Sequence, residues 1–455
     1  MAKDWWKDAA ADIPNLKTEI PGPKSKEQHE RATKHFHGLS GQVKLFPVSF
    51  EEGYGITLTD VDGNRYLDFS SGIYVTSLGH CHPKISEAVA HWAKKLMNAH
   101  DFTTPVKVAL LEKMADVLPK ELDGFQFYSD GTAVVEAGLR AARAISGKHE
   151  FISCFRDFHG KSMGAVSCAQ MVRGDVLSYG PTRAPGFYMV PRPNPYRPTF
   201  TKPDGTIDTD RYIAFYEQFI QEGTAGNVAA FVLEPVQGWG GSIFPPDDFF
   251  PKLKKLCDKK GILLFDDEVL AGMGRTGEWL AMQHWDVVPD IVTFGKSFGN
   301  GFPVTALVVK KEYADALNKI SASSSYGGNP MACAAALASL EVIEEEDILE
   351  NVRTVGKAIM KRMEKMKDEH PIIGDVKGKG FLLGIELVKD KATKEPFDEA
   401  GKLVYQKAFR KGLAWIPAGH ILRMSPPLLM NEKNAMMGLD TIEDAIAEAE
   451  KEIGY

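Results

Sequence analysis

Two short apolar segments near the middle of the chain are each followed by ionisable side chains. Residues 262–265 run directly into the acidic triplet 266–268, and residues 291–294 are followed by a glycine and Lys296. Runs of four apolar residues between polar or glycine residues are typical of buried strands in a parallel sheet. Ligands of open α/β sheets bind outside the carboxyl ends of the strands. The pattern therefore predicts one site that contains Asp267 together with Lys296.

The surrounding sequence alternates between strand-like and helix-like segments. Further apolar runs predict strands at 125–128, 151–155, 228–235 and 305–309. Helical spacing predicts helices at 134–145 and 246–260, each ended by a glycine. The strand at 228–235, the helix that follows it and the strand at 262–265 form a right-handed parallel crossover. Glu234 should therefore lie at the same edge of the sheet as Asp267.

The N-terminal region and one long internal segment follow a different pattern. Residues 55–67 alternate between apolar and polar positions around Asp62-Gly63, which predicts a hairpin. Helical spacing follows at 83–98. Residues 181–210 are rich in proline and aspartate, and we expect them to form a long excursion over the surface.

The last third of the chain predicts a separate, smaller α+β domain. Its expected elements are an alanine-rich helix at 331–344, short strands within 372–388 and 412–428, and amphipathic helices at 398–410 and 434–453. We expect an N-terminal arm that forms part of this small domain at 1–60, a large domain at 61–330 and the C-terminal small domain at 331–455. The predicted fold class is α/β, with a mainly parallel sheet flanked by helices in the large domain.

Composition and charge restrict the class of protein. The net charge of −7 gives no general attraction to nucleic acid or to an anionic membrane, so we expect neither partner. No segment approaches the roughly 20 apolar residues that span a bilayer, and the start of the chain lacks a signal peptide's apolar core. The five cysteines are scattered and not in CxxC spacing, which favours reduced thiols and a cytoplasmic protein.

The predicted site carries the chemistry that pyridoxal 5'-phosphate requires from a protein. A carboxylate such as Asp267 holds a pyridinium nitrogen, and a lysine such as Lys296 forms a Schiff base. The turn at 129–132, between a strand and a helix, would add backbone N–H groups and the Thr132 hydroxyl as a phosphate site. Thr132 or Asp130 could equally serve as a helix N-cap, so both interpretations stay open here.

Three other motifs do not support the functions that they resemble. His80, Cys81 and His82 lie side by side in a loop without the spacing of metal ligands, so no metal is expected. The glycines at 272–277 match GxGxxG but are followed by a loop instead of an opening helix, against a dinucleotide site. The Gly-Lys-Ser at 295–297 lacks the earlier glycine of a phosphate-binding P-loop.

An ordered series of motifs resembles the class III pyridoxal-phosphate-dependent aminotransferases of fold type I, in particular the ω-aminotransferases. The motifs are LDFSSGI, GHCHP, DGT, FHG, EPVQG, DDEV, GMGRTG, FGKS, YGGNP and RMSPPL. Each motif is weak alone, whereas the series in this order is specific and extends from about residue 50 to the C-terminus. The resemblance implies that 61–330 is the cofactor-binding domain and that the cofactor is pyridoxal 5'-phosphate.

The resemblance also implies roles for single residues at the cofactor. Lys296 resembles the lysine that bonds covalently to the cofactor, and Asp267 resembles the carboxylate that pairs with the pyridine nitrogen. Val269 is expected to pack on one face of the cofactor ring and Phe158 to stack on the other.

The phosphate contacts implied by the resemblance come from two subunits. Gly131 and Thr132 match the phosphate cradle, and Ser325 takes the place of a threonine that the neighbouring subunit usually donates. We therefore expect a homodimer with shared active sites, or a tetramer that contains such dimers.

The substrate contacts implied by the resemblance are Arg423, Trp239 and Tyr74. Arg423 resembles an arginine that binds a substrate carboxylate, a role suited to a planar bidentate donor. The expected reaction moves an amino group from an amine or amino acid to a keto acid, pyruvate or 2-oxoglutarate, in a ping-pong cycle.

Three positions depart from the family pattern. Trp239 stands where several branches have a glutamate that masks the substrate-binding arginine, so the two substrates must be accommodated differently. Leu270 replaces a glutamine beside the cofactor, and Ala133 replaces an acid after the phosphate cradle.

Two other activities within the family are alternatives to transamination. A racemase or epimerase needs a second acid or base, and relatives with that activity tend to carry aspartate at the position of Trp239, where an indole cannot act. A phospholyase is a weaker alternative. A non-enzymatic protein of the same fold would be suggested by a missing lysine or aspartate, and both are present.

Overall fold

The computed structural model describes residues 4–169 and 183–455, and internal contacts divide the chain into two compact units. The terminal unit joins Met1–Ser86 to Val342–Tyr455, and the central unit is Glu87–Glu341. The helices α4 (Pro83–Lys95) and α10 (Pro330–Glu345) each run from one unit into the other.

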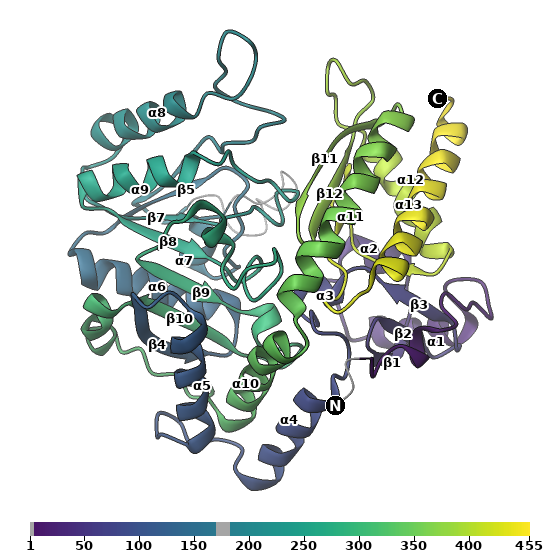
Figure 1. Cartoon of the computed structure of the whole chain (residues 1–455), viewed down its shortest axis with the longest axis horizontal. Coiled ribbons are helices and arrows are strands. Elements are labelled where there is room, and N and C mark those ends of the chain that lie inside the picture. Colours follow the sequence, from purple (N-terminus) through teal and green to yellow (C-terminus); the bar gives the residue numbers. More distant parts are fainter. Residues whose placement is uncertain (1–3, 170–182) are drawn as a thin grey trace. The chain divides into compact units, whose positions relative to one another are not determined.

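The central unit is built on a seven-stranded sheet, drawn in blue to green in Figure 1. The strands in order are β4 (Leu122–Tyr128), β10 (Thr305–Lys310), β9 (Ile291–Phe294), β8 (Leu263–Asp267), β7 (Val228–Leu233), β5 (Glu150–Cys154) and β6 (Phe187–Val190). The five strands from β9 to β6 are parallel, and β10 is antiparallel to β9 and β4. The predicted α/β class with a mainly parallel sheet is confirmed.

Helices connect the strands of the central unit. They are α5 (Pro105–Val117), α6 (Gly131–Ser146), α7 (Met163–Ser167), α8 (Thr209–Glu222), α9 (Phe249–Lys260) and the 3₁₀ segments η3 (Ala281–Trp285), η4 (Lys296–Phe298) and η5 (Lys311–Lys319). The predicted crossover is confirmed, because α9 joins β7 to its parallel neighbour β8. Gly147 and Gly261 end α6 and α9 with φ of +69° and +60°, a conformation that glycine adopts without strain.

The alternation of side chains along β8 determines on which face of the sheet Asp267 lies. Leu263 and Phe265 belong to the core that α6 forms with the sheet. The packing is close, since a Cβ on Gly138 of α6 would lie 2.3 Å from the Phe265 ring. Side chains two residues apart point to the same face of a strand. Asp267 therefore lies on the face covered by α6.

One predicted feature of the central unit is wrong. Residues 181–210 were expected to be a surface excursion, but Phe187–Val190 forms β6, the edge strand next to β5. The run is as short as the predicted strands, but Gly186 precedes it, Pro191 follows it and the whole segment is rich in proline, which favoured a loop. Residues 181 and 182 lie outside the described residues.

The terminal unit contains two small sheets. The first has the order β1 (Phe50–Tyr54), β2 (Thr57–Asp60), β3 (Arg65–Asp68) and β13 (Leu413–Ala414), and the second has the order β11 (Ile373–Lys379), β12 (Leu382–Leu387) and β14 (Ile421–Met424). Its helices are η1 (Asp8–Ala10), α1 (Pro23–Thr33), α2 (Gly41–Leu45), α3 (Ser71–Tyr74), α11 (Ile348–Glu369), α12 (Asp398–Arg410) and α13 (Glu432–Ile453). The hairpin predicted at 55–67 is present as β2 and β3.

Residues 61–86 group with the terminal unit, although we expected them in the large domain. The reason is a pairing between distant segments: β3 is parallel to β13, with Leu67 opposite Leu413. Such a pairing across more than 300 residues leaves no local signal in the sequence. Within the described residues, no helix is long and apolar enough to cross a membrane.

Candidate active site

Asp267 ends β8 as a buried carboxylate held by three donors. Its side chain is 4% exposed. Oδ2 lies 2.7 Å from Nδ1 of His159, while Oδ1 accepts from Thr293 Oγ1 at 3.0 Å and from the Val269 N–H at 3.1 Å. A carboxylate can accept about four hydrogen bonds. The group therefore has capacity for one further donor, which suits the N–H of a protonated pyridine ring.

His159 is the electrostatic partner of this carboxylate. The imidazole is fully buried, and its Nε2 lies 3.7 Å from Oδ2 of Asp157. Burial alone lowers the pKa of His159, but the neighbouring carboxylates of Asp157 and Asp267 outweigh burial and raise it to about 10. His159 is therefore a cation at neutral pH. Its charge lies beside the buried Asp267 carboxyl group, where an opposite charge offsets part of the cost of burial.

The register of the sheet brings an acid and the lysine to neighbouring strand ends. Asp267 of β8 is paired with Thr293 of β9, and Lys296 follows β9 after a single glycine. Lys296 is partly buried and has a φ of +44°, an unusual backbone conformation for a residue with a side chain. Such strained positions cluster at functional sites. The sequence prediction that Asp267 and Lys296 share one edge of the sheet agrees with this register.

Val269 lies between two glycine-containing segments of the site. A Cβ on Gly131 would approach Val269 Cγ1 to 3.5 Å, and a Cβ on Gly295 would approach it to 3.1 Å. The turn before α6, the turn before Lys296 and the segment after Asp267 therefore meet around one side chain. This arrangement fits a flat cofactor ring packed on Val269.

The N-terminus of α6 resolves the two interpretations of the turn at 129–132. Asp130 is the N-cap, because its side chain accepts from the Ala133 N–H at 3.0 Å. Thr132 Oγ1 accepts from the Ser162 N–H at 3.0 Å and lies 2.5 Å from Ser162 Oγ. Since Ser162 Oγ donates to Glu136, the Thr132 hydroxyl donates to Ser162. Any anion cradle here consequently rests on the backbone N–H groups of the first turn and on the helix dipole.

Two aromatic side chains face each other from separate loops. Phe158 follows β5 and Trp239 follows β7; both are partly buried. Their ring centroids are 6.1 Å apart with a tilt of 41°. Ser325 lies in the loop before α10, where its side chain is exposed and its carbonyl accepts from Asn98 Nδ2 at 2.9 Å.

The two remaining predicted residues belong to the terminal unit. Arg423 in β14 is 3% exposed and lies opposite Gly384 of β12. Tyr74, 2% exposed, ends a turn in which all four residues from Ser71 onward have positive φ. Ser425 joins these segments, since its hydroxyl donates to the Ser70 carbonyl and its carbonyl accepts from the Ser71 hydroxyl.

The histidines of the GHCHP motif bind separate carboxylates. His80 Nε2 lies 2.8 Å from Asp68 Oδ2, and His82 Nε2 lies 3.1 Å from Glu346 Oε1. Each imidazole therefore has a structural partner within the terminal unit.

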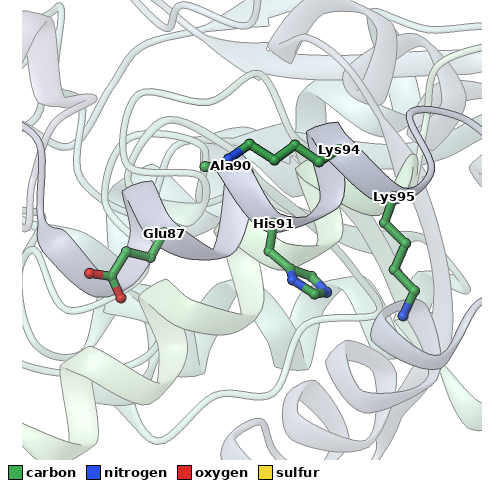
Figure 2. A pocket seen from close by; sticks show the side chains of 5 residues that line it. All are labelled: Glu87, Ala90, His91, Lys94 and Lys95. Carbon is green, nitrogen blue, oxygen red and sulfur yellow. The ribbon is translucent and has the colours of Figure 1, made fainter.

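A hollow along the exposed side of α4 contains none of the predicted site residues. Figure 2 shows its lining, Glu87, Ala90, His91, Lys94 and Lys95, spread along one helix. Because its walls come from one helix, it does not gather catalytic groups from separate elements.

Sequence reasoning missed the residues that support Asp267. Thr293 of β9 and His159 of the loop after β5 contact Asp267, and Asp157 of the same loop contacts His159; these pairings depend on strand register. The only local signal was the histidine in the FHG motif, which by itself could not be distinguished from a buried structural histidine.

We predict that His159 stays charged across the neutral pH range and that Asp157 contributes to this. An NMR titration of histidine imidazoles in the cofactor-free protein should show one signal, absent in His159→Gln, that does not titrate between about pH 6 and 8. Asp157→Asn removes one of the two carboxylate partners, so the pKa of that signal should fall toward the ordinary value of 6.5. A neutral His159 at pH 7 in the unmodified protein would contradict the prediction.

Comparison with known proteins identifies the family. The model of the class-III aminotransferases matches residues 39–446. An alanine/serine racemase of Pyrococcus horikoshii is 34% identical, with 96% of this chain and 93% of that protein covered, and a probable 4-aminobutyrate aminotransferase of Bacillus subtilis is also 34% identical, with 86% and 91% covered.

A solved amine transaminase from an uncultivated Pseudomonas species, in its form with bound pyridoxal phosphate, is 30% identical. The TM-score is 0.84, and the similarity covers 91% of this chain and 98% of that one. The family and the fold are those expected from the motifs, and class III aminotransferases use pyridoxal 5'-phosphate. The chain belongs to the class-III aminotransferases, which are pyridoxal-phosphate-dependent transferases of fold type I.

Proposed function

We propose that this protein transfers an amino group from an amine or amino-acid donor to a keto acid by a ping-pong mechanism. The observation that carries the proposal is the buried Asp267 carboxylate, which has three donors and room for a fourth, next to the strand end that bears Lys296. Pyridoxal 5'-phosphate, when bound, accepts the electrons that the donor releases when its Cα–H bond breaks.

The side chains have separate roles in this proposal. Asp267 keeps the pyridine nitrogen protonated, and His159 keeps Asp267 ionised. Lys296 would hold the cofactor covalently between turnovers, and its free amine would take the proton from the donor carbon. Val269 and Phe158 hold the two faces of the ring, and the turn at Gly131 and Thr132 binds the phosphate. The donor leaves as a ketone or aldehyde, and the keto acid leaves as an amino acid.

We propose that substrate choice depends on Arg423, Trp239 and Tyr74. The guanidinium of Arg423 binds the carboxylate of the keto acid, pyruvate or 2-oxoglutarate. Trp239 cannot form an ion pair with an arginine, so it acts through its size and limits the donors that fit.

We further propose a homodimer in which Ser325 serves the partner's cofactor phosphate. Ser325 is exposed beside Tyr326, which is 69% exposed, and the same unit exposes Met97 (63%) and Phe102 (80%). Exposed large apolar side chains of this kind are typical of subunit interfaces. Each of the five cysteines is free, which favours a reducing compartment, and we infer a cytoplasmic protein.

Racemisation is the second candidate, because relatives 34–35% identical to this chain are named alanine/serine and leucine/methionine racemases. A racemase that works with two bases needs an acid or base on each face of the donor carbon. The indole of Trp239 cannot supply one. Transamination requires only the lysine and is therefore the function that we favour.

The spectrum of the purified protein with a donor and no keto acid tests this proposal. We expect a visible absorption band of the bound cofactor that bleaches as the donor is converted, because the amino group stays on the enzyme. Lys296→Ala should lose steady-state transamination, while Lys311→Ala, an exposed lysine, should keep it. A band that persists while the donor exchanges its α-proton for deuterium would instead identify a racemase.

A complementation experiment tests the shared site. Ser325→Asp places a negative charge at the phosphate and should inactivate the enzyme, as should Lys296→Ala. Co-expression of the two variants should restore about a quarter of the activity, since half of the dimers are hybrids and one of their two sites carries both native residues. No recovery, despite demonstrated hybrid dimers, would assign Ser325 to its own subunit.

Replacement of Trp239 tests the pocket wall. Trp239→Ala should raise kcat/KM for bulky donors relative to small ones by roughly tenfold or more, because an indole occupies the volume of several methylene groups. Trp92→Ala on α4 serves as a control for tryptophan removal. An unchanged donor profile would exclude Trp239 from the pocket.

A further inference from the structure

Glu234 bridges two loops with one buried carboxyl group. It directly follows β7, and the residue is 7% exposed. Oε1 accepts from the Phe158 N–H at 2.9 Å, and Oε2 accepts from the Gly238 N–H at 3.0 Å. Both oxygens therefore bind backbone, each in a different loop.

These two loops carry the two facing aromatic rings. Phe158 is itself bound by Glu234, and Trp239 immediately follows Gly238. Because both bonds are to main chain, the carboxyl group fixes where the two backbones lie, independently of the aromatic side chains. The distance of 6.1 Å between the rings is consequently a property of backbones that Glu234 holds together.

Close packing restricts where the loop that carries Trp239 can lie. A Cβ on Gly238 would lie 2.3 Å from Leu270 Cδ1, so the loop runs directly against Leu270. Gln237 adds a second link, since its Nε2 donates to Asp157 Oδ1 at 2.6 Å and its Oε1 accepts from Arg192 at 3.0 Å. Glu234 and Gln237 thus both link the segment just before Trp239 to the loop that carries Phe158.

The raised pKa of Glu234 agrees with a structural role in the hydrogen-bond network of the two loops. Burial and the neighbouring Asp157 raise the pKa of Glu234 to about 8, while the nearby His159 opposes the increase. A carboxyl group placed here for charge alone would be unfavourable beside Asp157 and Asp267. Its two hydrogen bonds give the geometric reason for its presence.

We propose that Glu234 is a positioning residue for donor selection, which sets the separation of the Phe158 and Trp239 loops by binding the backbone of each. It acts through Trp239 and touches neither the cofactor nor the donor. The inference rests on the proposed function only in the assignment of Trp239 to the donor pocket; the bridge itself is independent of activity.

Hydrogen exchange in the cofactor-free protein tests the bridge directly. In Glu234→Gln the amide nitrogen cannot accept, so only one of the two bonds can persist. We expect amide exchange of Phe158 or Gly238 to accelerate roughly 5- to 10-fold. Glu217→Gln makes the same substitution at a partly exposed acid on α8 and should leave both amides unchanged. Unchanged exchange at both amides in Glu234→Gln would overturn the proposal, whatever the enzyme's activity.

A double-mutant cycle tests the effect on donor selection. Glu234→Gln alone should change the ratio of kcat/KM between bulky and small donors severalfold, mainly through KM, with the visible spectrum of the bound cofactor unchanged. In the Trp239→Ala background the same substitution should no longer change that ratio, because residues that act as a unit are not additive. An equal effect in both backgrounds would refute action through Trp239.

The two measurements separate the failure of this inference from the failure of the proposed function. Faster exchange in a protein without transaminase activity would support the bridge and refute the function. Normal transamination with unchanged exchange would support the function and refute the bridge.

Discussion

The candidate site of the central unit depends on the accommodation of one buried carboxylate, Asp267. Burial of an isolated Asp267 anion would cost several kcal/mol, so the site is possible only with donors and a compensating charge. Thr293 and the Val269 N–H supply donors, and His159 supplies the charge. His159 is in turn charged because a second carboxylate, Asp157, lies on its other side. A protonated cofactor nitrogen can then complete the set of partners.

The parallel sheet makes this set of contacts possible. Neighbouring parallel strands end at the same edge, so residues from the ends of β5, β7, β8 and β9 can meet although they are far apart in the sequence. The period of two along each strand selects the face: Asp267 follows Phe265 onto the side that α6 covers. The positive end of α6 and the turn that we propose binds the phosphate are therefore on the same side of the sheet as the acid.

Within a family that shares this core, donor choice depends on loops that the sheet does not determine. In the function that we propose, Trp239 stands at the position of an ion-pairing acid and selects donors by shape instead of charge. Selection by shape requires a wall that stays in place, since a mobile wall would accommodate a larger donor at little cost. The bond from the Gly238 N–H to Glu234 and the side-chain bond from Gln237 to Asp157 hold that loop in place. A change of substrate class can thus depend on the residues that hold a pocket-lining loop in place as well as on the residues that line the pocket.

The sequence alone was sufficient for the strands at 228–235, 262–265 and 291–294, the crossover between the first two, and the presence of Asp267 and Lys296 at one sheet edge. Apolar runs, stop glycines and strand-end charges are local signals, and the order of motifs identified the family. The tertiary structure decided which groups hold Asp267 and that Asp130, not Thr132, caps α6. It also showed that Phe187–Val190 is a strand and that residues 61–86 belong to the terminal unit. Each of these depends on strand register or on contacts between distant segments, and such pairings have no periodicity that a single sequence can reveal.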